Sequence, residues 1–349
     1  MPSRNSDASK TNPVQLHQNF LDLNSVTKLP DSHAWTSADY EYHPGDSCSS
    51  EMLPVIDLND PNAPQLVCEA CKTWGAFQVA NHGITTQLFN DIESAASSLF
   101  SLPKEQKLKV ARAPDSFSGY GMPRIASHFS KLMWYEGFTI IGSPLEHARQ
   151  LWPQDYNKFC DVIEEYKKEM KQLTGRLIWL MLGPLGITKE DIEWAGKGGE
   201  SALQLNSYPV CPDPDHAMGL AEHTDSTLFT ILHQNNTSGL QVLQEETGWV
   251  TVPPLPSTLV VNIGDLLHIL SNGLYHSVLH RAMVNRNQHR FSVAYLSGPP
   301  AGTLISPLSK LVDKSHPPLY RPVSWSEYLS AKKEHFNNTL STIRLYSPQ

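Results

Sequence analysis

Two hydrophobic patterns divide the chain near residue 200. Between residues 155 and 182 apolar side chains recur every three or four positions, with charged residues between them. This spacing predicts one long amphipathic helix. Beyond residue 200 the period falls to two, as in Phe291, Val293 and Tyr295. Several short runs of this kind, separated by turn signals, predict a mainly β fold with flanking helices, in which a jelly roll forms the core.

Mixed helix and strand patterns precede the long helix. Short apolar runs favour strands, and longer stretches with the helical period favour helices. The last of these helices is charged and opens at Pro103, a residue suited to a helix start. Residues 114–153 are rich in glycine, proline and aromatic residues and are expected to be irregular. The expected elements are strands at 53–58 and 76–80 and helices at 62–74, 86–102 and from 103 onwards.

These patterns predict five consecutive segments. The first is polar and aperiodic, which favours partial order. The segments are a partly ordered lead-in (1–50), a mixed α/β region (51–153), a long support helix with its connection (154–200), the jelly-roll core (201–300) and a C-terminal helical segment (301–349).

Composition narrows the class of protein. The 349 residues carry a formal net charge of -8, which argues against a nucleic-acid partner. No apolar run approaches the roughly 18 residues needed to cross a bilayer, and the first twelve residues lack the apolar stretch of a secretory signal. The five cysteines are scattered, as free thiols in a reducing compartment would be. No membrane association and a cytoplasmic location are therefore expected.

The first candidate for chemistry is His223-Thr224-Asp225. If residues 220–234 form one extended strand, His223 and Asp225 project to the same side, and Thr227, Phe229 and Ile231 continue that face. An imidazole beside a carboxylate is two thirds of a site for a divalent transition metal. A third histidine would complete the 2-His-1-carboxylate triad that is typical of non-haem Fe(II) oxygenases.

That histidine has to come from a later strand. The candidates are His268, His276, His280 and His289. His276 and His280 lie on the same predicted strand face, and the pattern alone does not choose between them. His280 is favoured because it lies inside the strand, where a rigid element holds a ligand in place.

Arg290 and Ser292 form the second candidate. They share one face of a predicted strand, opposite apolar residues. An arginine that faces inwards needs a partner, because an unpaired buried charge is very costly. A bound carboxylate would satisfy it. A surface arginine paired with a glutamate is the alternative.

The order of these motifs resembles that of the plant 2-oxoglutarate- and Fe(II)-dependent dioxygenases. The resemblance implies a double-stranded β-helix (jelly roll) buttressed by helices, with Fe(II) bound by His223, Asp225 and His280 rather than by His276. It further implies that Arg290 and Ser292 hold the far carboxylate of 2-oxoglutarate, that Tyr208 and Asn206 assist at its near end, that O₂ is consumed and that ascorbate serves as reductant. The matching segments are His223-Thr224-Asp225, Val278-Leu279-His280-Arg281, Arg290-Phe291-Ser292, Asn206-Ser207-Tyr208-Pro209-Val210-Cys211, 53–58 and 74–83.

Within that family, residues 29–35, 133–140 and 152–153 resemble the gibberellin 3-oxidases. This resemblance implies a gibberellin precursor as substrate and 3β-hydroxylation. A monomer is expected. Trp134, Tyr135 and Phe138 would then wall the substrate pocket, although such an aromatic cluster more often covers a core.

Several alternatives share these features. Gibberellin 20- and 2-oxidases and flavonoid dioxygenases use the same catalytic motifs. A non-catalytic gibberellin- or metabolite-binding module would keep the jelly roll without turnover, but it would not need the metal triad. A zinc hydrolase built on the same three ligands would leave Arg290 and Ser292 without a role.

Overall fold

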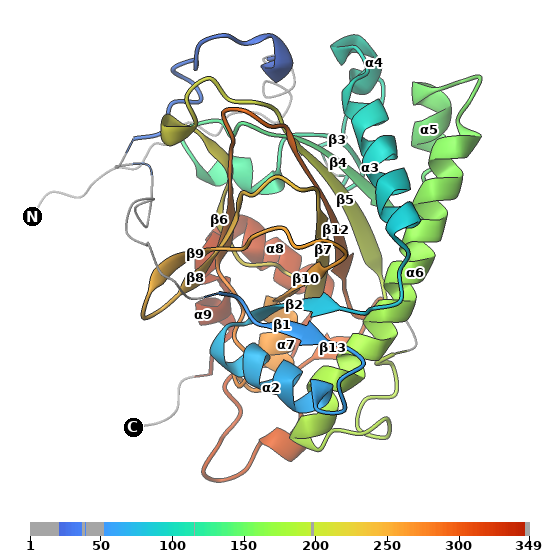
Figure 1. Cartoon of the computed structure of the whole chain (residues 1–349). Coiled ribbons are helices and arrows are strands. Elements are labelled where there is room, and N and C mark those ends of the chain that lie inside the picture. Colours follow the sequence, from blue (N-terminus) through green and yellow to red (C-terminus); the bar gives the residue numbers. More distant parts are fainter. Residues whose placement is uncertain (1–20, 37–38, 40–51, 115, 197–198, 346–349) are drawn as a thin grey trace, which may run out of the picture.

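The computed structural model describes residues 21–36, 39, 52–114, 116–196 and 199–345. Most of the predicted lead-in therefore lies outside the described residues, and the boundaries of the five predicted segments stay a prediction. Strands form the centre of the molecule, and helices cover it (Figure 1). Among the described residues, every helix is too short or too polar to cross a bilayer.

The larger sheet of the core carries Arg290 and Ser292. Its first pair, β1 and β2, is parallel, and its other neighbouring strands are antiparallel. It therefore joins strands from the N-terminal region to strands of the core. In sheet order the strands are β1 (Val55–Asp57), β2 (Ala76–Ala80), β10 (Leu259–Ile263), β7 (Phe229–Gln234), β12 (Arg290–Ser297), β5 (Ser201–Tyr208), β4 (Glu136–Ile141) and β3 (Gly119–Gly121).

A smaller antiparallel sheet carries His223 and His280. It consists of β6 (Met218–His223), β11 (His280–Met283), β8 (Leu240–Gln244) and β9 (Gly248–Thr251). The two sheets form the double-stranded β-helix, so the predicted fold class is confirmed. A separate ribbon pairs β13 (Leu304–Ile305) with β14 (Val323–Ser324).

The predicted long helix is α6 (Asn157–Leu182). Its buried face includes Ile163, Tyr166, Met170 and Leu177, each with no exposed surface. Burial of each such side chain stabilises the fold by about 1.5–3 kcal/mol. The helix runs along one side of the molecule beside α3 (Thr86–Phe100) and contacts α2 (Ala63–Thr73), so these helices brace the large sheet (Figure 1).

The remaining helices are short. The elements labelled η are 3-10 helices, and those labelled α are α-helices. They are η1 (Leu23–Ser25), α4 (Lys104–Leu108), η3 (Arg124–His128), α5 (Leu145–Leu151), η4 (Gly183–Leu185), η5 (Pro214–His216), α7 (Asp265–Leu270), η6 (Ser309–Leu311), α8 (Trp325–His335), η7 (Phe336–Asn338) and α9 (Thr339–Ile343).

Two expectations about local structure are wrong. Residues 220–234 are not one strand, because β6 ends at His223 and β7 begins at Phe229 in the other sheet. Thr227, Phe229 and Ile231 therefore do not continue the face of His223. Residues 114–153 are not irregular either, since they contain β3, β4 and α5. Strand β4 is buried over five of its six residues, so the alternation that marks a half-exposed strand is missing.

Candidate active site

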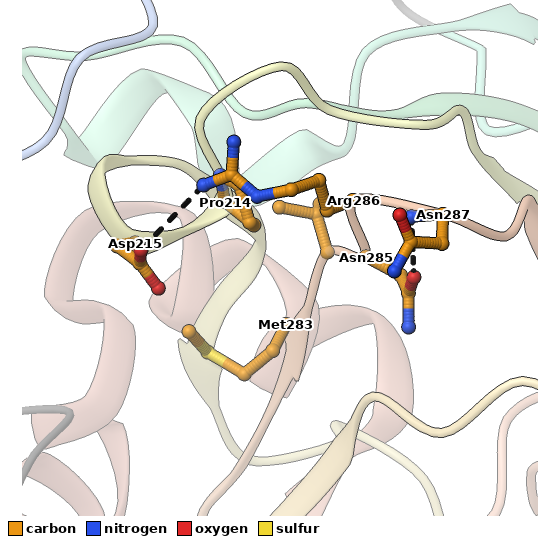
Figure 2. A pocket seen from close by; sticks show the side chains of 7 residues that line it. Pro214, Asp215, Met283, Asn285, Arg286 and Asn287 are labelled. Carbon is orange, nitrogen blue, oxygen red and sulfur yellow. Dashed lines mark hydrogen bonds and ion pairs between the residues drawn. The ribbon is translucent and has the colours of Figure 1, made fainter.

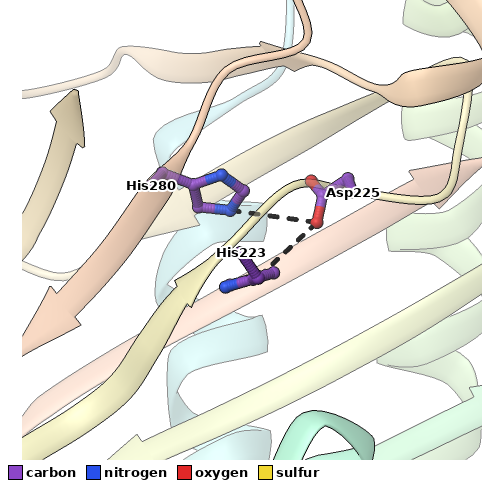
Figure 3. A group of neighbouring side chains, drawn as sticks. All are labelled: His223, Asp225 and His280. Atoms are coloured by element: carbon purple, nitrogen blue, oxygen red, sulfur yellow. Dashed lines mark ion pairs between the residues drawn. The ribbon is translucent and has the colours of Figure 1, made fainter. Parts of the chain in front are cut away.

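His223, Asp225 and His280 meet where β6 and β11 lie side by side (Figure 3). His223 and His280 are cross-strand partners, and Asp225 follows directly after the end of β6. The Nε2 atoms of His223 and His280 lie 3.6 and 3.8 Å from the Asp225 Oδ1 atom. All three donor atoms lie within 4.8 Å of one another, a spacing at which one ion can contact all three at roughly 2 Å.

The atoms behind these donors fix their orientation. Nδ1 of His223 lies 2.8 Å from the Ala221 carbonyl oxygen, and Nδ1 of His280 lies 3.1 Å from that of Val278. A carbonyl oxygen only accepts, so each Nδ1 carries the proton and each Nε2 keeps its lone pair for the centre. Oδ2 of Asp225 accepts a hydrogen bond of 2.6 Å from Thr230. Two imidazole nitrogens and one carboxylate oxygen form the donor set that suits Fe(II).

Burial favours the form of His223 that binds a metal. Burial, followed by the neighbouring His280, lowers the pKa of the His223 imidazole to about 4. His223 is therefore neutral near pH 7, as metal coordination requires.

The other candidate histidines lie elsewhere. His276 is exposed, and its backbone N–H donates to Cys71. His268 contacts the Tyr275 carbonyl and the Tyr320 hydroxyl, and His289 contacts the Ser207 hydroxyl. Of the four candidate histidines, the structure therefore places only His280 beside His223 and Asp225.

A cavity of about 900 Å³ adjoins the three donors. Arg290 and Ser292 on β12 line it, together with their cross-strand partners Tyr208 and Asn206 on β5. The Arg290 guanidinium lies 4.9 Å from the centre of the Tyr208 ring. Asn206 donates to the Ser292 hydroxyl at 3.2 Å. All four residues thus lie together on one wall of the cavity.

Arg290 is the least satisfied of these groups. It is 1% exposed, and Nη2 donates to the Gln234 side chain at 3.1 Å. Nε and Nη1 have no hydrogen-bond partner among the described residues, and none of these residues forms an ion pair with Arg290. Burial lowers the pKa of its guanidinium. A buried cation without a counter-charge is costly, so the site fits a ligand that brings a carboxylate.

Of Trp134, Tyr135 and Phe138, the structure places only Tyr135 beside the cavity, and its role towards the substrate stays a prediction. This residue lines the cavity, and its hydroxyl donates to Asn206 and accepts from Gln204, both at 2.8 Å. Trp134 donates instead to the Pro209 carbonyl and packs in a small cluster away from the cavity. Phe138 is buried in the main core, edge-on to His147. Alternate residues of an extended chain face opposite sides, and Trp134 and Phe138 face away from the cavity.

A buried ionic cluster behind the metal ligands was not predicted. Asp265 has no exposed surface and accepts hydrogen bonds from Lys332 (2.8 Å), Tyr328 (2.7 Å) and Thr224 (3.1 Å). Its backbone N–H donates to the carbonyl of Asp225 at 2.8 Å. The cluster therefore ties helix α8 to the loop that carries the ligand Asp225. Asp265 begins helix α7 and Lys332 lies on α8, and no spacing in the sequence connects them.

Comparisons with known proteins agree with this geometry. The model of the 2OG-Fe(II) oxygenase superfamily matches residues 199–299, and that of the N-terminal region of non-haem dioxygenases in morphine synthesis matches residues 53–159. The crystal structure of JOX2 in complex with 2OG, Fe and JA superimposes with a TM-score of 0.79 at 30% identity, covering 93% of this chain and 95% of that one. A rice dioxygenase for auxin oxidation superimposes with a TM-score of 0.71 at 26% identity, covering 84% of this chain and 100% of the other.

Relatives of known name match over the whole chain. Gibberellin 3-beta-dioxygenase 1 of Pisum sativum is 58% identical, over 100% of this chain and 95% of its own length. Gibberellin 3-beta-dioxygenase 1 of Arabidopsis thaliana is 53% identical, over 99% of each chain. Together with the three converging donors, these matches show that the chain belongs to the gibberellin 3-beta-dioxygenase family within the 2OG-Fe(II) oxygenase superfamily.

Proposed function

We propose that this chain uses Fe(II), 2-oxoglutarate and O₂ to hydroxylate gibberellin precursors at the 3β position. The observation that carries the proposal is the placement of a buried, incompletely paired Arg290 in the same cavity as three inward-facing metal donors. The names of the relatives support the choice of substrate.

His223, Asp225 and His280 would hold the iron on one side and leave its other side open to the cavity. Bound iron supplies, with 2-oxoglutarate and O₂, an oxidant strong enough for an unactivated C–H bond. The protein then has to orient its ligands and needs no acid–base pair. The carbonyls of Ala221 and Val278 and the Thr230 hydroxyl keep the three donors in place before the metal arrives.

Arg290 and Ser292 would anchor the far carboxylate of 2-oxoglutarate. The planar guanidinium can donate two parallel hydrogen bonds to a carboxylate, and the Ser292 hydroxyl adds a third. Tyr208 and Asn206, on the neighbouring strand, would fix the nearer part of the cosubstrate. Leu220, Leu232 and Leu240 line the same cavity, and such apolar walls exclude water from the reaction.

The test is product analysis under controlled oxygen. The purified chain is incubated anaerobically with Fe(II), 2-oxoglutarate and one member of a panel of gibberellins and flavonoids, and O₂ is then admitted. We expect a gain of one oxygen atom at the 3β position of a gibberellin precursor and about one succinate per product. Oxidation at another carbon would assign a 20- or 2-oxidase, and a flavonoid product would assign a flavonoid dioxygenase. Binding without any oxidation would assign a non-catalytic module.

Three finer statements stay predictions. Ascorbate is expected to sustain turnover as reductant, which an omission experiment checks. A monomeric state is expected, and light scattering on the eluted protein measures it. A cytoplasmic location is expected, and imaging of a fluorescent fusion tests it.

A further inference from the structure

The cavity carries far more positive than negative side chains. Its described acidic residues are Asp225, which is one of the three metal donors, and Glu200. Several of its cations have partners: Lys332 pairs with Asp265 at 2.8 Å, and Lys167 lies 3.7 Å from Glu164. The cationic residues that line the cavity are Arg112, Arg124, Lys167, Arg281, Arg290, Lys332 and Lys333.

Arg112 is held in place without a counter-charge. Its guanidinium donates to the Met122 carbonyl at 3.2 Å and to the Thr139 hydroxyl at 3.0 Å. Nε has no partner among the described residues, and none of them forms an ion pair with Arg112. Both acceptors are neutral, so they fix the direction of the guanidinium without cancelling its charge.

Arg124 lies close by at the exposed side of the cavity. Its guanidinium carbon is 3.6 Å from the centre of the Phe117 ring. Burial, followed by the repulsion of Arg112, lowers the pKa of Arg124. Within the described part of the chain, Arg124 also lacks an acidic partner. Both guanidinium groups line the cavity without an acidic partner among the described residues, so an anion bound beside them would be favoured.

The Arg112–Arg124 pair is separate from the Arg290 site. Thr139, which accepts from Arg112, pairs across the sheet with Gln204, whereas Asn206 pairs with Ser292. Gln204 and Asn206 are two residues apart on β5, which corresponds to about 7 Å along the strand. The pair therefore lies further along the same sheet than the residues expected to hold 2-oxoglutarate.

The residues around the pair indicate an apolar ligand. Ile125, Ile141 and Phe336 line the same cavity. Phe336 stacks on His128 with ring centres 4.6 Å apart. Apolar walls beside two cations suit a hydrophobic skeleton that carries a carboxylate.

We propose that Arg112 and Arg124 form a subsite for the carboxylate of the prime substrate, which orients the apolar skeleton towards the metal donors. The inference rests on the proposed function, because it assumes that the oxidised substrate is an apolar acid. 2-Oxoglutarate also carries carboxylates. The test therefore has to distinguish binding of the substrate carboxylate from binding of the cosubstrate.

The experiment compares Arg112→Gln and Arg124→Gln with Arg286→Gln. Arg286 is a matched control, since it is an exposed arginine in a shallow hollow with Met283 and lies 3.6 Å from Asp215 (Figure 2). We expect each test variant to raise the KM for the gibberellin acid about tenfold or more, as loss of one charge-assisted contact does. The KM for 2-oxoglutarate should stay within about twofold, and Arg286→Gln should behave as wild type.

A methyl ester of the same substrate gives an independent readout. Wild type should prefer the acid over the ester, and the preference should collapse in both test variants. Arg124 is exposed, so Arg124→Gln is expected to fold even if Arg112→Gln does not. Unchanged acid preference in Arg124→Gln, or an equal rise of both KM values, would overturn the subsite.

Anaerobic calorimetry separates this inference from the proposed function. It measures binding of the gibberellin acid without turnover. If wild type binds the acid but oxidises no gibberellin, the proposed function fails, and the loss of binding in the two variants still decides the subsite. If wild type does not bind the acid at all, the subsite is wrong as well.

Discussion

The two ends of the cavity differ in how completely their polar groups are satisfied. At the metal end each ligand has a partner behind it, and the Asp265 cluster fixes the connecting loop. At the other end Arg112 and Arg124 project without a described counter-charge. The three metal donors are thus held in place by the protein alone, whereas the Arg112–Arg124 pair becomes electrostatically complete only with a ligand.

The largest effect is expected at the metal end. Asp225→Ala removes the only anionic donor, so turnover should fall by more than about 100-fold, since loss of a residue that merely orients a ligand already costs about 10–100-fold. Circular dichroism should show an unchanged fold. Thr230→Val is the graded control, because it removes only the 2.6 Å hydrogen bond to Oδ2. Equal activity of Asp225→Ala and wild type would reject the metal site.

The ionic cluster gives the next largest effect. Lys332→Met leaves Asp265 buried without its cation, so the free energy of unfolding should fall by about 3–5 kcal/mol. Lys310→Met is the matched control, because Lys310 pairs with Asp191 at 2.7 Å but its side chain is 47% exposed. That pair should contribute less than about 1 kcal/mol. Urea unfolding at pH 7 measures both, and equal losses would refute the special role of the buried pair.

The same pair makes a prediction about pH. Burial raises the pKa of Asp265, but Lys332 and the Ser277 and Tyr328 hydroxyls outweigh it and leave the pKa below its ordinary value. The charged carboxylate therefore stabilises the fold above the unfolded pKa of about 3.9, and this contribution is lost as the pH falls through the lower folded pKa. In Lys332→Met the effect of burial is less opposed, so acid unfolding should begin at a higher pH. Unfolding curves between pH 3 and 7 test the shift.

The structure brings the three predicted metal donors together, and most of the sequence signals at this end of the cavity are local. His223 and Asp225 are two positions apart, and Arg290 and Ser292 share one strand face. In extended chain such spacings determine which side chains lie together, even though β6 ends before Asp225. The choice of His280 over His276 needed more, since it depends on where β11 begins.

The rest of the cavity depends on contacts between distant segments. Asp265 and Lys332 come from α7 and α8, and no periodicity connects them. The placement of Phe138 has a related cause, because the face of β4 that lines the cavity depends on its packing beside β5. Trp134 lies before β4 begins. Both faces of β4 are buried, so the hydrophobic pattern did not indicate which face lines the cavity.

Arg290→Leu is expected to weaken binding of 2-oxoglutarate and to leave binding of the gibberellin nearly unchanged. The KM for 2-oxoglutarate should rise by about 10- to 100-fold, which corresponds to the 1.5–3 kcal/mol of a charge-assisted hydrogen bond. The KM for the gibberellin should change little, which is the reverse of the pattern expected for Arg124→Gln. Succinate release at varied concentrations of each substrate measures both constants. Equal increases would mean that Arg290 does not contact the cosubstrate.

The smallest expected effect comes from comparing Phe138, which was predicted to line the substrate pocket, with Phe336, which lines the cavity in the structure. Phe138 is buried in the core, so Phe138→Leu should lower the free energy of unfolding by about 1 kcal/mol and leave the KM for the prime substrate unchanged. Phe336 lines the cavity, so Phe336→Leu should raise that KM by about two- to fivefold, the effect of one lost aromatic contact. Steady-state kinetics and urea unfolding on the same two proteins make the comparison. A change of KM in Phe138→Leu without one in Phe336→Leu would return the substrate wall to β4 and remove η7 from the site.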